Sequence, residues 1–373
     1  MSAPGFRGVR GVIPILLAAL ASAAVAGVAV YLQAATELRA ATDDKVTALM
    51  QVRRDALRDY LNSVLEETRF WNKNRVMRAA LVEFSAAWKE LPEPETTLQR
   101  LYIDDNPYPT GEKDNLERAT DSSTYSDVHA RYHYWLRSFL LHRGVHDVFL
   151  FDPEGNLVYT SLKERDFATN LGTGPWAETD LGRAFRVARG NPYPSFVAFF
   201  DFAPYAPSGG APASFFASAV LDDTGAFLGV LAFQIPADRI NAIMQVDAGL
   251  GESGETYAVG ADLLMRSDSR FSEESTTLKT RVDTATVARA LAGETGLEIV
   301  HDTRGVPVVS AYGPLEFEDV TWAVMAEIDE AEVRQPLVRI RGRAVLVALI
   351  GVALASLLGV LVLAASNRAE SAR

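Results

Sequence analysis

Residues 146–171 read HDVFLFDPEGNLVYTSLKERDFATNL, and this stretch sets the fold class. Two runs rich in apolar and aromatic residues, 145–152 and 157–164, enclose the turn sequence PEGN at 153–156. Turn residues between two such runs predict a β-hairpin. The stretch therefore predicts two antiparallel strands that open a sheet.

Further strand-like runs follow a helical patch near 176–188. They are SFVAFFDFA (195–203), APASFFASAVL (211–221) and AFLGVLAFQI (226–235). With the hairpin they predict a five-stranded antiparallel sheet with helices to one side. A smaller set repeats the plan: ETYAVG (255–260), LLMRSD (263–268), a helix near 283–291, GLEIVHD (296–302), VPVVSAYGPL (306–315) and VTWAVMAEI (320–328). The predicted fold class is α+β, with two tandem antiparallel-sheet modules.

A long helix is predicted ahead of these modules. No Pro or Gly occurs from 37 to 91, and apolar residues at 57, 61, 64 and 71 recur at the spacing of one helix face. If continuous, a helix of this length would reach about 80 Å and would span two stacked units. Pro92 and Pro94 then end it.

Two runs without Asp, Glu, Lys or Arg lie near the ends of the chain. Each run, Gly11–Thr36 and Ala344–Asn367, is long enough for a helix to cross a hydrocarbon core of about 30 Å. Both are interpreted as transmembrane helices. For the first run a cleaved signal peptide is the alternative, because Arg7 and Arg10 precede it. Small residues four apart in both runs also suggest helix pairing or a dimer.

Charge distribution gives an orientation and excludes one class of partner. The two short tails carry +3 of a total net charge of −12, so the region from Glu37 to Arg343 carries −15. The positive-inside rule places the tails in the cytoplasm and the acidic region outside, although Arg339, Arg341 and Arg343 weaken the asymmetry. An acidic domain is a poor partner for nucleic acid. The lack of cysteine removes thiol nucleophiles, thiolate zinc sites and iron–sulfur clusters.

The chain is accordingly divided into eight parts. The predicted parts are a cytoplasmic N-terminus (1–10), a first transmembrane helix (11–36), a long helix (37–91), a membrane-distal module (92–248), a membrane-proximal module (249–335), a connecting helix (336–343), a second transmembrane helix (344–366) and a cytoplasmic tail (367–373).

Three strings resemble those of a known family. They are HDVFLFDPEGNLVYTSLKERDFATNL, YAPSGGAPASF (205–215) and GESGETYAVGADLLMRSDSRF (251–271). Together with the order of elements, they resemble the double-Cache domains of bacterial chemoreceptors, sensor kinases and cyclases over about residues 36–335. The resemblance implies two PAS-like modules that bind a small molecule outside the cell and signal inward. The output parts usual in that family are expected on a partner or a longer chain, because only a short tail follows the second span.

Candidate ligand contacts lie in the first module, where polar and aromatic residues are mixed. Ligand pockets in such modules lie between the sheet and the loops that cross it. The candidates are Tyr159, Lys163, Asp166, Trp176, Asp201 and Tyr205. Strand alternation places Leu157 with Tyr159 on one face. Asp201 is singled out because a buried carboxylate needs a partner, either a ligand amine or a nearby arginine.

Two further observations bear on the class of ligand and on the number of ligand sites. An amino-acid-binding version of the family uses an Arg-x-Trp-Tyr arrangement after the second strand, whereas this chain has Arg165, Asp166 and Phe167, which disfavours an amino-carboxylate ligand. In the second module Arg266 is expected to pair with a turn carboxylate rather than to form a second ligand site.

Histidines supply the alternative of a membrane-held metal hydrolase. His129 and His133 lie four apart on a predicted helix, as do His142 and His146 across its end, and this spacing can hold zinc. A third ligand and a glutamate base are missing, so surface histidines are the favoured interpretation and no metal or cofactor is expected.

The sequence as a whole predicts a receptor in a bacterial inner membrane without catalytic activity. Its periplasmic domain is expected to bind an unidentified small solute, to form a homodimer and to signal to a cytoplasmic or membrane partner. A membrane scaffold without a sensing role is a third possibility.

Overall fold

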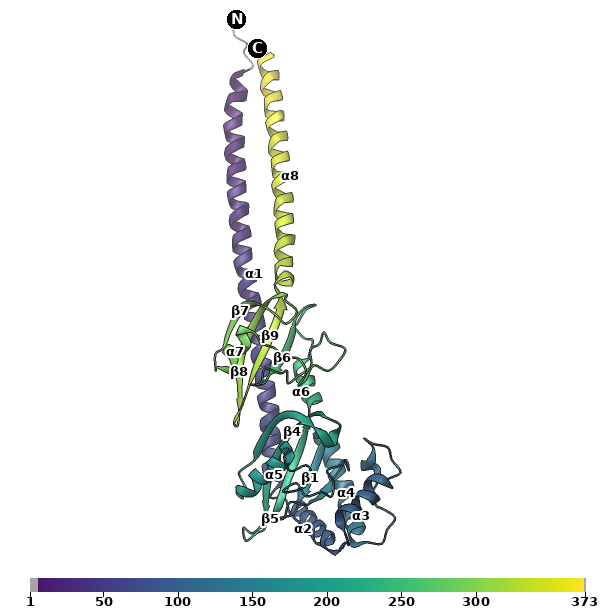
Figure 1. Cartoon of the computed structure of the whole chain (residues 1–373). Helices are drawn as coiled ribbons and strands as arrows, with labels where there is room; N and C mark the ends of the chain where they lie inside the picture. Colours follow the sequence, from purple (N-terminus) through teal and green to yellow (C-terminus); the bar gives the residue numbers. More distant parts are fainter. Residues whose placement is uncertain (1–5, 372–373) are drawn as a thin grey trace.

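The computed structural model describes residues 6–371, so parts of the two predicted tails lie outside the described residues. Two sheet modules follow one another along the long helix α1 (Phe6–Trp71), and α8 (Glu330–Ser371) runs beside its N-terminal half (Figure 1). Both ends of the chain lie at the same end of the molecule, far from the first module. The module that comes first in the sequence is therefore the distal one.

The predicted continuous helix over 37–91 is wrong, because α1 ends at Trp71 and α2 (Arg75–Glu90) begins after a short break. Asn74 has an extended backbone, and its side chain accepts hydrogen bonds from the backbone N–H groups of Val76 and Met77. Such an N-cap favours a new helix start. Asn72 donates to Ser218 Oγ at 2.6 Å, which ties the break to the sheet.

The distal sheet has five antiparallel strands, as predicted, and their order is β2-β1-β5-β4-β3. Its strands are β1 (Asp147–Phe151), β2 (Leu157–Thr160), β3 (Ala198–Tyr205), β4 (Ala211–Leu221) and β5 (Phe227–Pro236). The helical elements of this module are α3 (Pro94–Gln99), η1 (Arg100–Asp104), η2 (Lys113–Asn115), α4 (Thr124–Arg143), α5 (Asp180–Gly190) and η3 (Ala206–Ser208). The β1–β2 hairpin confirms the interpretation of residues 146–171.

Helices cover both faces of this sheet, so the expectation of helices on one side is wrong. One face carries Phe149, Phe151 and Phe215 and packs against α5 through Phe185. The other face packs against α1, α2 and α4. Strands buried on both faces account for the almost unbroken apolar runs in their sequences.

Two irregularities interrupt the strand alternation in the distal sheet, and the first makes the predicted common face of Leu157 and Tyr159 wrong. The β1–β2 register shifts so that Leu150 faces Tyr159 while Phe151 faces Leu157. Leu157 therefore belongs to the core under α5, whereas Tyr159 belongs to the core on the opposite face. A second shift in β3, between Phe200 and Ala203, includes Asp201. An extra residue in one strand reverses the alternation beyond it.

The proximal module holds a four-stranded antiparallel sheet in the order β6-β9-β8-β7. It contains β6 (Glu255–Val259), α7 (Ala285–Leu291), β7 (Gly296–His301), β8 (Pro307–Phe317) and β9 (Val320–Asp329), and α6 (Ala237–Met244) connects the two sheets and contacts β5 and β6. The predicted strand LLMRSD forms only isolated bridges, Val259 with Met265 and Leu264 with Arg281. The segment is instead a loop that lies across the sheet edge.

Helix α8 continues from β9 without a break and lies against α1. Among the described residues, the helical segment Leu20–Trp71 is long and apolar enough to cross a membrane. The corresponding apolar segment of α8, Leu349–Leu361, is shorter.

Candidate functional site

The structure places four of the six candidate residues at one end of the distal sheet as two contacting pairs, Lys163 with Tyr159 and Asp166 with Tyr205. Tyr159, Lys163, Asp166 and Tyr205 are all buried there. They lie where the loop after β2 meets the turn after β3. We call the four, together with Asp147, Glu164, Ser208 and Gln234, the distal polar cluster.

Lys163 is a buried lysine with an unusual backbone conformation. Its φ of 56° lies in the left-handed region, which residues other than glycine seldom adopt. Nζ donates to the carbonyl oxygen of Thr160 and lies 4.4 Å from the centroid of the Tyr159 ring. Burial lowers the pKa of Lys163, and the carboxylates of Asp147 and Asp114 oppose this effect. Backbone strain of this kind gathers at functional sites.

Asp147 holds the start of the loop after β2. Its carboxylate accepts hydrogen bonds from Ser161 N at 2.8 Å, from Val148 N at 2.7 Å and from the Thr160 hydroxyl. Burial raises the pKa of Asp147, while these donors and Lys163 oppose the rise. Sequence reasoning missed Asp147, although a carboxylate at the head of the buried run DVFLF was a signal for it.

Asp166 is fully buried, and only one of its two carboxyl oxygens has a hydrogen-bond partner. The Tyr205 hydroxyl donates to its Oδ2 at 2.5 Å, whereas its Oδ1 is buried without a hydrogen-bond partner. Burial raises the pKa of Asp166 to about 8; the Tyr205 hydrogen bond opposes this, and the charges of Glu164 and Asp147 add to it. Because buried polar groups are nearly always paired, the free Oδ1 is exceptional.

Gln234, in β5, supplies a second unpaired acceptor. The residue is 2% exposed, its Oε1 has no partner, and its Nε2 lies 3.4 Å from Ser208 Oγ. Ser208 in turn donates to Glu164 Oε2 at 2.6 Å. Sequence reasoning missed Gln234, although a lone amide in the apolar strand AFLGVLAFQI was a signal for it.

A cleft of about 910 Å³ opens beside the distal polar cluster. Lys163, Glu164 and Ser208 form part of its wall, and His146 and Leu162 line it nearby. Gln234 reaches this wall through Ser208. Of the two residues with unpaired acceptors, Gln234 contacts a wall residue, and neither Gln234 nor Asp166 lines the cleft itself.

Trp176 lies next to the distal polar cluster but does not line the cleft. Its Nε1 donates to the carbonyl oxygen of Arg165 at 3.3 Å, and its ring packs against the core under α5. Gln99 donates to the carbonyl oxygen of Phe167 at 3.0 Å from the other side. Both contacts fix the loop that carries Asp166.

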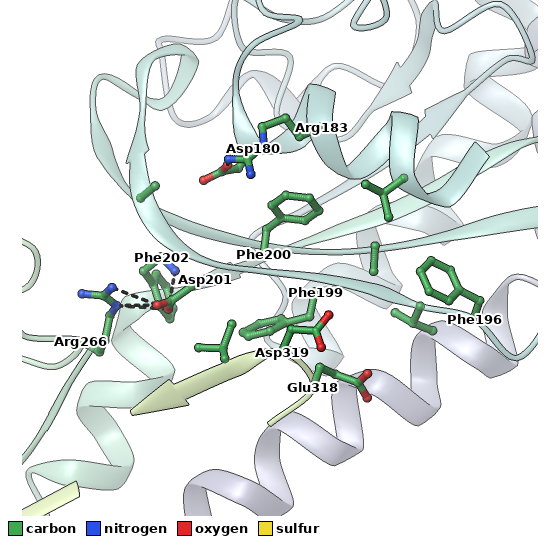
Figure 2. Close-up of a pocket in the computed structure, with 15 residues that line it drawn as sticks. Asp180, Arg183, Phe196, Phe199, Phe200, Asp201, Phe202, Arg266, Glu318 and Asp319 are labelled. Carbon is green, nitrogen blue, oxygen red and sulfur yellow. Dashed lines mark hydrogen bonds and ion pairs between the residues drawn. The ribbon is translucent and has the colours of Figure 1, made fainter. Parts of the chain in front are cut away.

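Asp201 lies apart from the cluster, at the junction of the two modules (Figure 2). Its Oδ2 is 2.9 Å from Arg266 Nη2, and the Trp322 indole donates to its Oδ1 at 3.0 Å. Arg266 also donates to Asp262 at 3.0 Å, which is the turn pairing expected from the sequence. A ligand amine is therefore not needed to balance Asp201, because an arginine does so.

A groove of about 500 Å³ lies beside this junction. Figure 2 shows Phe196, Phe199 and Phe200 of the distal module across from Glu318 and Asp319 of the proximal one. Phe199 packs edge-on against Phe317 at a centroid distance of 5.1 Å. The two modules thus share an apolar contact beside the Asp201–Arg266 ion pair.

The expectation that His129 and His133 lie on the surface is wrong. Both are fully buried in α4, and their rings stack 4.3 Å apart. His133 bonds to the Tyr159 hydroxyl at 2.8 Å and to the carbonyl oxygen of Asp114 at 2.7 Å, so both its ring nitrogens are engaged. Burial lowers the pKa of His133 to about 3. Within residues 6–371 no group of three side chains could hold a metal ion.

Two sheet modules on one helix, with an open cleft beside buried polar groups, define a ligand-binding sensor domain. The family model described as the Cache domain matches residues 34–337. The chain belongs to the double-Cache family, as its sequence strings suggested.

Solved structures with a similar fold include three chemoreceptor ligand-binding domains. That of PctC of Pseudomonas aeruginosa in complex with GABA is 14% identical, with 77% of this chain and 100% of that chain covered and a TM-score of 0.45. That of Campylobacter jejuni Tlp3 with 4-methylisoleucine is 14% identical, covering 80% and 95%, with a TM-score of 0.47. That of Pseudomonas fluorescens CtaA with L-isoleucine is 14% identical, covering 80% and 96%, with a TM-score of 0.42. A comparison with curated proteins gives no match.

Proposed function

We propose that this chain is a transmembrane receptor whose outer double-Cache domain binds a small solute at the distal polar cluster. The observation that carries the proposal is the pair of unpaired buried acceptors, Asp166 Oδ1 and Gln234 Oε1. An unsatisfied buried acceptor costs about 1 to 3 kcal/mol. A solute that donates to these atoms recovers this cost, and we propose that it enters from the cleft that Lys163, Glu164 and Ser208 line.

The loop after β2 is suited to respond to such a solute. It carries Lys163, Glu164 and Asp166 on one short segment, and it contains two residues, Lys163 and Ala168, with positive φ. A solute that bonds to Asp166 pulls on a segment already held in a strained conformation. Ligands shift an equilibrium only through different affinities for its two states, typically by 1 to 3 kcal/mol.

We propose that the conformational change reaches the membrane through elements that are joined in sequence or packed against one another. Asp201 and Arg266 join the distal sheet to the proximal module, and β9 of that module continues directly into α8. Helix α1 contacts both sheets and α8. A change in the distal module therefore reaches α8 through packed elements. The receptor is proposed to act as a homodimer with a cytoplasmic or membrane signalling partner.

A thermal-shift screen of the full chain in detergent tests the binding proposal. Amino acids, organic acids, amines and purines are compared. A solute at 100 times its dissociation constant adds about 2.7 kcal/mol of apparent stability. We expect at least one class to shift the unfolding temperature, and Asp166→Asn and Gln234→Leu to abolish the shift. The matched control Asp319→Asn, in the exposed β8–β9 turn, keeps it. No shift with any class, or a shift that both variants retain, contradicts the proposal.

The proposed topology has both ends of the chain in the cytoplasm and the modules outside. Because the chain has no cysteine, single cysteines report accessibility without background. Ser63→Cys in the exposed part of α1 is expected to react with a membrane-impermeant maleimide in intact cells. Ser371→Cys is expected to react only after the membrane is opened. Labelling of both positions in intact cells contradicts this topology.

A further inference from the structure

A row of acidic side chains crosses the proximal sheet. The pairing of β7 with β8, of β8 with β9 and of β9 with β6 places four residues side by side in the order Glu298, Ser310, Glu327 and Glu255. Residues directly opposite one another in antiparallel strands project from the same face of the sheet, and like charges in such positions destabilise the pairing. The three glutamates of this acidic row therefore need partners.

The two outer glutamates have such partners. Glu298, on β7, pairs with Arg289. Glu255 is half-buried and accepts a hydrogen bond from Ser269 Oγ at 2.7 Å. Burial raises the pKa of Glu255, and this hydrogen bond and the charge of Arg304 oppose the rise. Groups that stabilise a negative charge thus lie at both ends of the acidic row.

Glu327 lies between them without a cationic partner. It is 2% exposed, and its Oε1 accepts a hydrogen bond from Ser310 Oγ at 2.8 Å. Among the side chains that the structure describes, no lysine, arginine or histidine pairs with it. Burial raises the pKa of Glu327 to about 7, and the hydroxyl groups of Ser310 and Tyr257 oppose the rise. The charges of Glu255 and Asp302 add to it.

The arginines whose charges reach the acidic row at Glu255 are already paired with other acids. Arg304, in the β7–β8 turn, pairs with Asp302 at 2.6 Å and with Asp329 at 3.0 Å. Arg270, in the loop after β6, lies 3.7 Å from an exposed aspartate. Within the described part of the chain, a charge on the central glutamate consequently has no counter-ion of its own.

The acidic row lies at the start of α8. Glu327 is three residues before α8 begins, and β9 leads into this helix without a break. Ser253, two residues before Glu255, donates to Glu332 in the first turn of α8 through its backbone N–H at 2.8 Å and also through its hydroxyl. The backbone N–H of the last residue of β9 donates to Ser253 Oγ at 3.1 Å. The first turn of α8 is thus bound to the segment that enters β6.

We infer that the proximal module binds a proton at Glu327 and that release of this proton moves the start of α8, so that external pH is a second input to the receptor. The inference rests on the topology and on the transmission through α8 proposed above, and it is independent of the solute site. Ionised Glu327 lies opposite Glu255, and two negative charges in these positions oppose the pairing of β9 with β6. Because Ser253 ties the entry of β6 to α8, a separation of these strands displaces the first turn of the helix.

Infrared difference spectroscopy on the full chain in lipid nanodiscs tests the proton site. The method detects the C=O stretch of a protonated carboxyl. We expect a band that disappears as the pH rises, with a midpoint near pH 7, and that is absent from Glu327→Gln. Burial also raises the pKa of Asp166, in the distal module, to about 8. The bands of such other carboxyls are expected to remain in Glu327→Gln, so the difference between the two proteins isolates Glu327.

Spin labels on Thr36→Cys and Arg341→Cys test the movement of α8 in the same nanodiscs without solute. The distance distribution is expected to differ between about pH 5 and about pH 9, two units to either side of the midpoint. In Glu327→Gln this difference is expected to be lost, because glutamine keeps the uncharged form at both pH values. Glu316→Gln is the matched control, since Glu316 is an exposed glutamate of the same sheet. This control keeps both the band and the change in distance.

Glu255→Gln supplies a second variant that leaves Glu327 in place. It removes the neighbouring negative charge and is expected to lower the midpoints of the band and of the distance change by about one pH unit, a tenfold loss of proton affinity. If Glu327→Gln does not fold, as judged by circular dichroism, this shift takes its place as the test. Unchanged midpoints in Glu255→Gln overturn the inference.

The remaining outcomes separate this inference from the proposal beneath it. A set of carboxyl bands that Glu327→Gln leaves unchanged overturns the proton site. A band of Glu327 that titrates while the helix distance stays constant overturns the link to α8; if a saturating solute still changes the distance, the proposed transmission stands. If neither pH nor a saturating solute changes the distance, the inference and the proposed transmission both fail.

Discussion

Replacing Asp201 by alanine removes the ion pair that joins the two modules. Arg266 has a side chain only 4% exposed, and it loses its carboxylate partner in the distal module. Trp322, 1% exposed, loses the acceptor of its indole N–H. Breaking a buried ion pair costs about 3 to 5 kcal/mol, and an unpaired buried donor about 1 to 3 kcal/mol.

The net cost is smaller than the sum of these two effects, for two reasons. Asp262 still pairs with Arg266, and the Asp201 side chain is 22% exposed, so water can replace part of the lost interaction. We therefore expect Asp201→Ala to lower the free energy of unfolding by about 3 kcal/mol. Urea unfolding of the full chain in detergent, followed by circular dichroism, measures this value.

A matched control lies in the same groove. Asp319 is exposed and lines the groove beside Asp201, so Asp319→Ala is expected to change stability by less than about 0.5 kcal/mol. The double variant Asp201→Ala with Arg266→Met is expected to recover part of the loss, because no buried charge is left unpaired. A loss below about 1 kcal/mol for Asp201→Ala, or one equal to that of the control, shows that the ion pair does not fasten the modules.

Three further changes probe other parts of the fold by urea unfolding. Asn74→Ala removes the N-cap of α2 and is expected to lower the free energy of unfolding by about 1 kcal/mol. An unchanged free energy of unfolding would show that the cap does not stabilise the protein. Gly229→Ala places a Cβ against the carbonyl oxygen of Phe151 and is expected to cost about 2 kcal/mol or more, whereas a neutral result would contradict the β1–β5 pairing. Burial raises the pKa of Glu327 to about 7, so the folded state binds a proton more tightly and stability falls as pH rises from about 4.5 to 7. The free energy of unfolding of Glu327→Gln, measured relative to that of the native chain, is expected to rise by about 3 kcal/mol between pH 4.5 and pH 8. An equal difference between the two proteins at both pH values would contradict this expectation.

Much of the fold could be predicted because its signals are local. The hairpin of residues 146–171 has its turn between two strand-like runs, and the later strands match the predicted runs closely except for LLMRSD (263–268), which is a loop. Proline at 94 marks the first turn of α3, and α8 continues from the second sheet as expected. Local patterning also predicted the five antiparallel strands of the first sheet, but it did not predict the order of the strands in either sheet.

The errors have tertiary causes. The break after Trp71 depends on hydrogen bonds from Asn72 and Asn74 to distant or capping groups, which helix periodicity does not reveal. The face of Tyr159 depends on a register shift against β1. His129 and His133 are polar, but their neighbours in space bury them.

Some residues of the candidate site could be predicted from the sequence, and the others could not because their role depends on tertiary contacts. Lys163, Asp166 and Tyr205 drew attention as polar or aromatic residues next to strands, and the structure places them at one end of the distal sheet. Asp147 and Gln234 lie inside apolar strands, and their role follows only from the partners they have or lack. Asp201 drew attention as a carboxylate that needs a partner; it is half-buried, and its partner is Arg266 from the other module.

The proposal that ties these parts together is that a solute at the distal polar cluster moves α8 relative to α1. Spin labels on Thr36→Cys and Arg341→Cys, both exposed positions, report the distance between these helices in the full chain in lipid nanodiscs. With a saturating solute identified by the screen, the distance distribution is expected to shift. The same solute is expected to leave it unchanged in Asp166→Asn. An unchanged distribution in the native background, at a concentration where titration shows the site filled, would contradict transmission through α8.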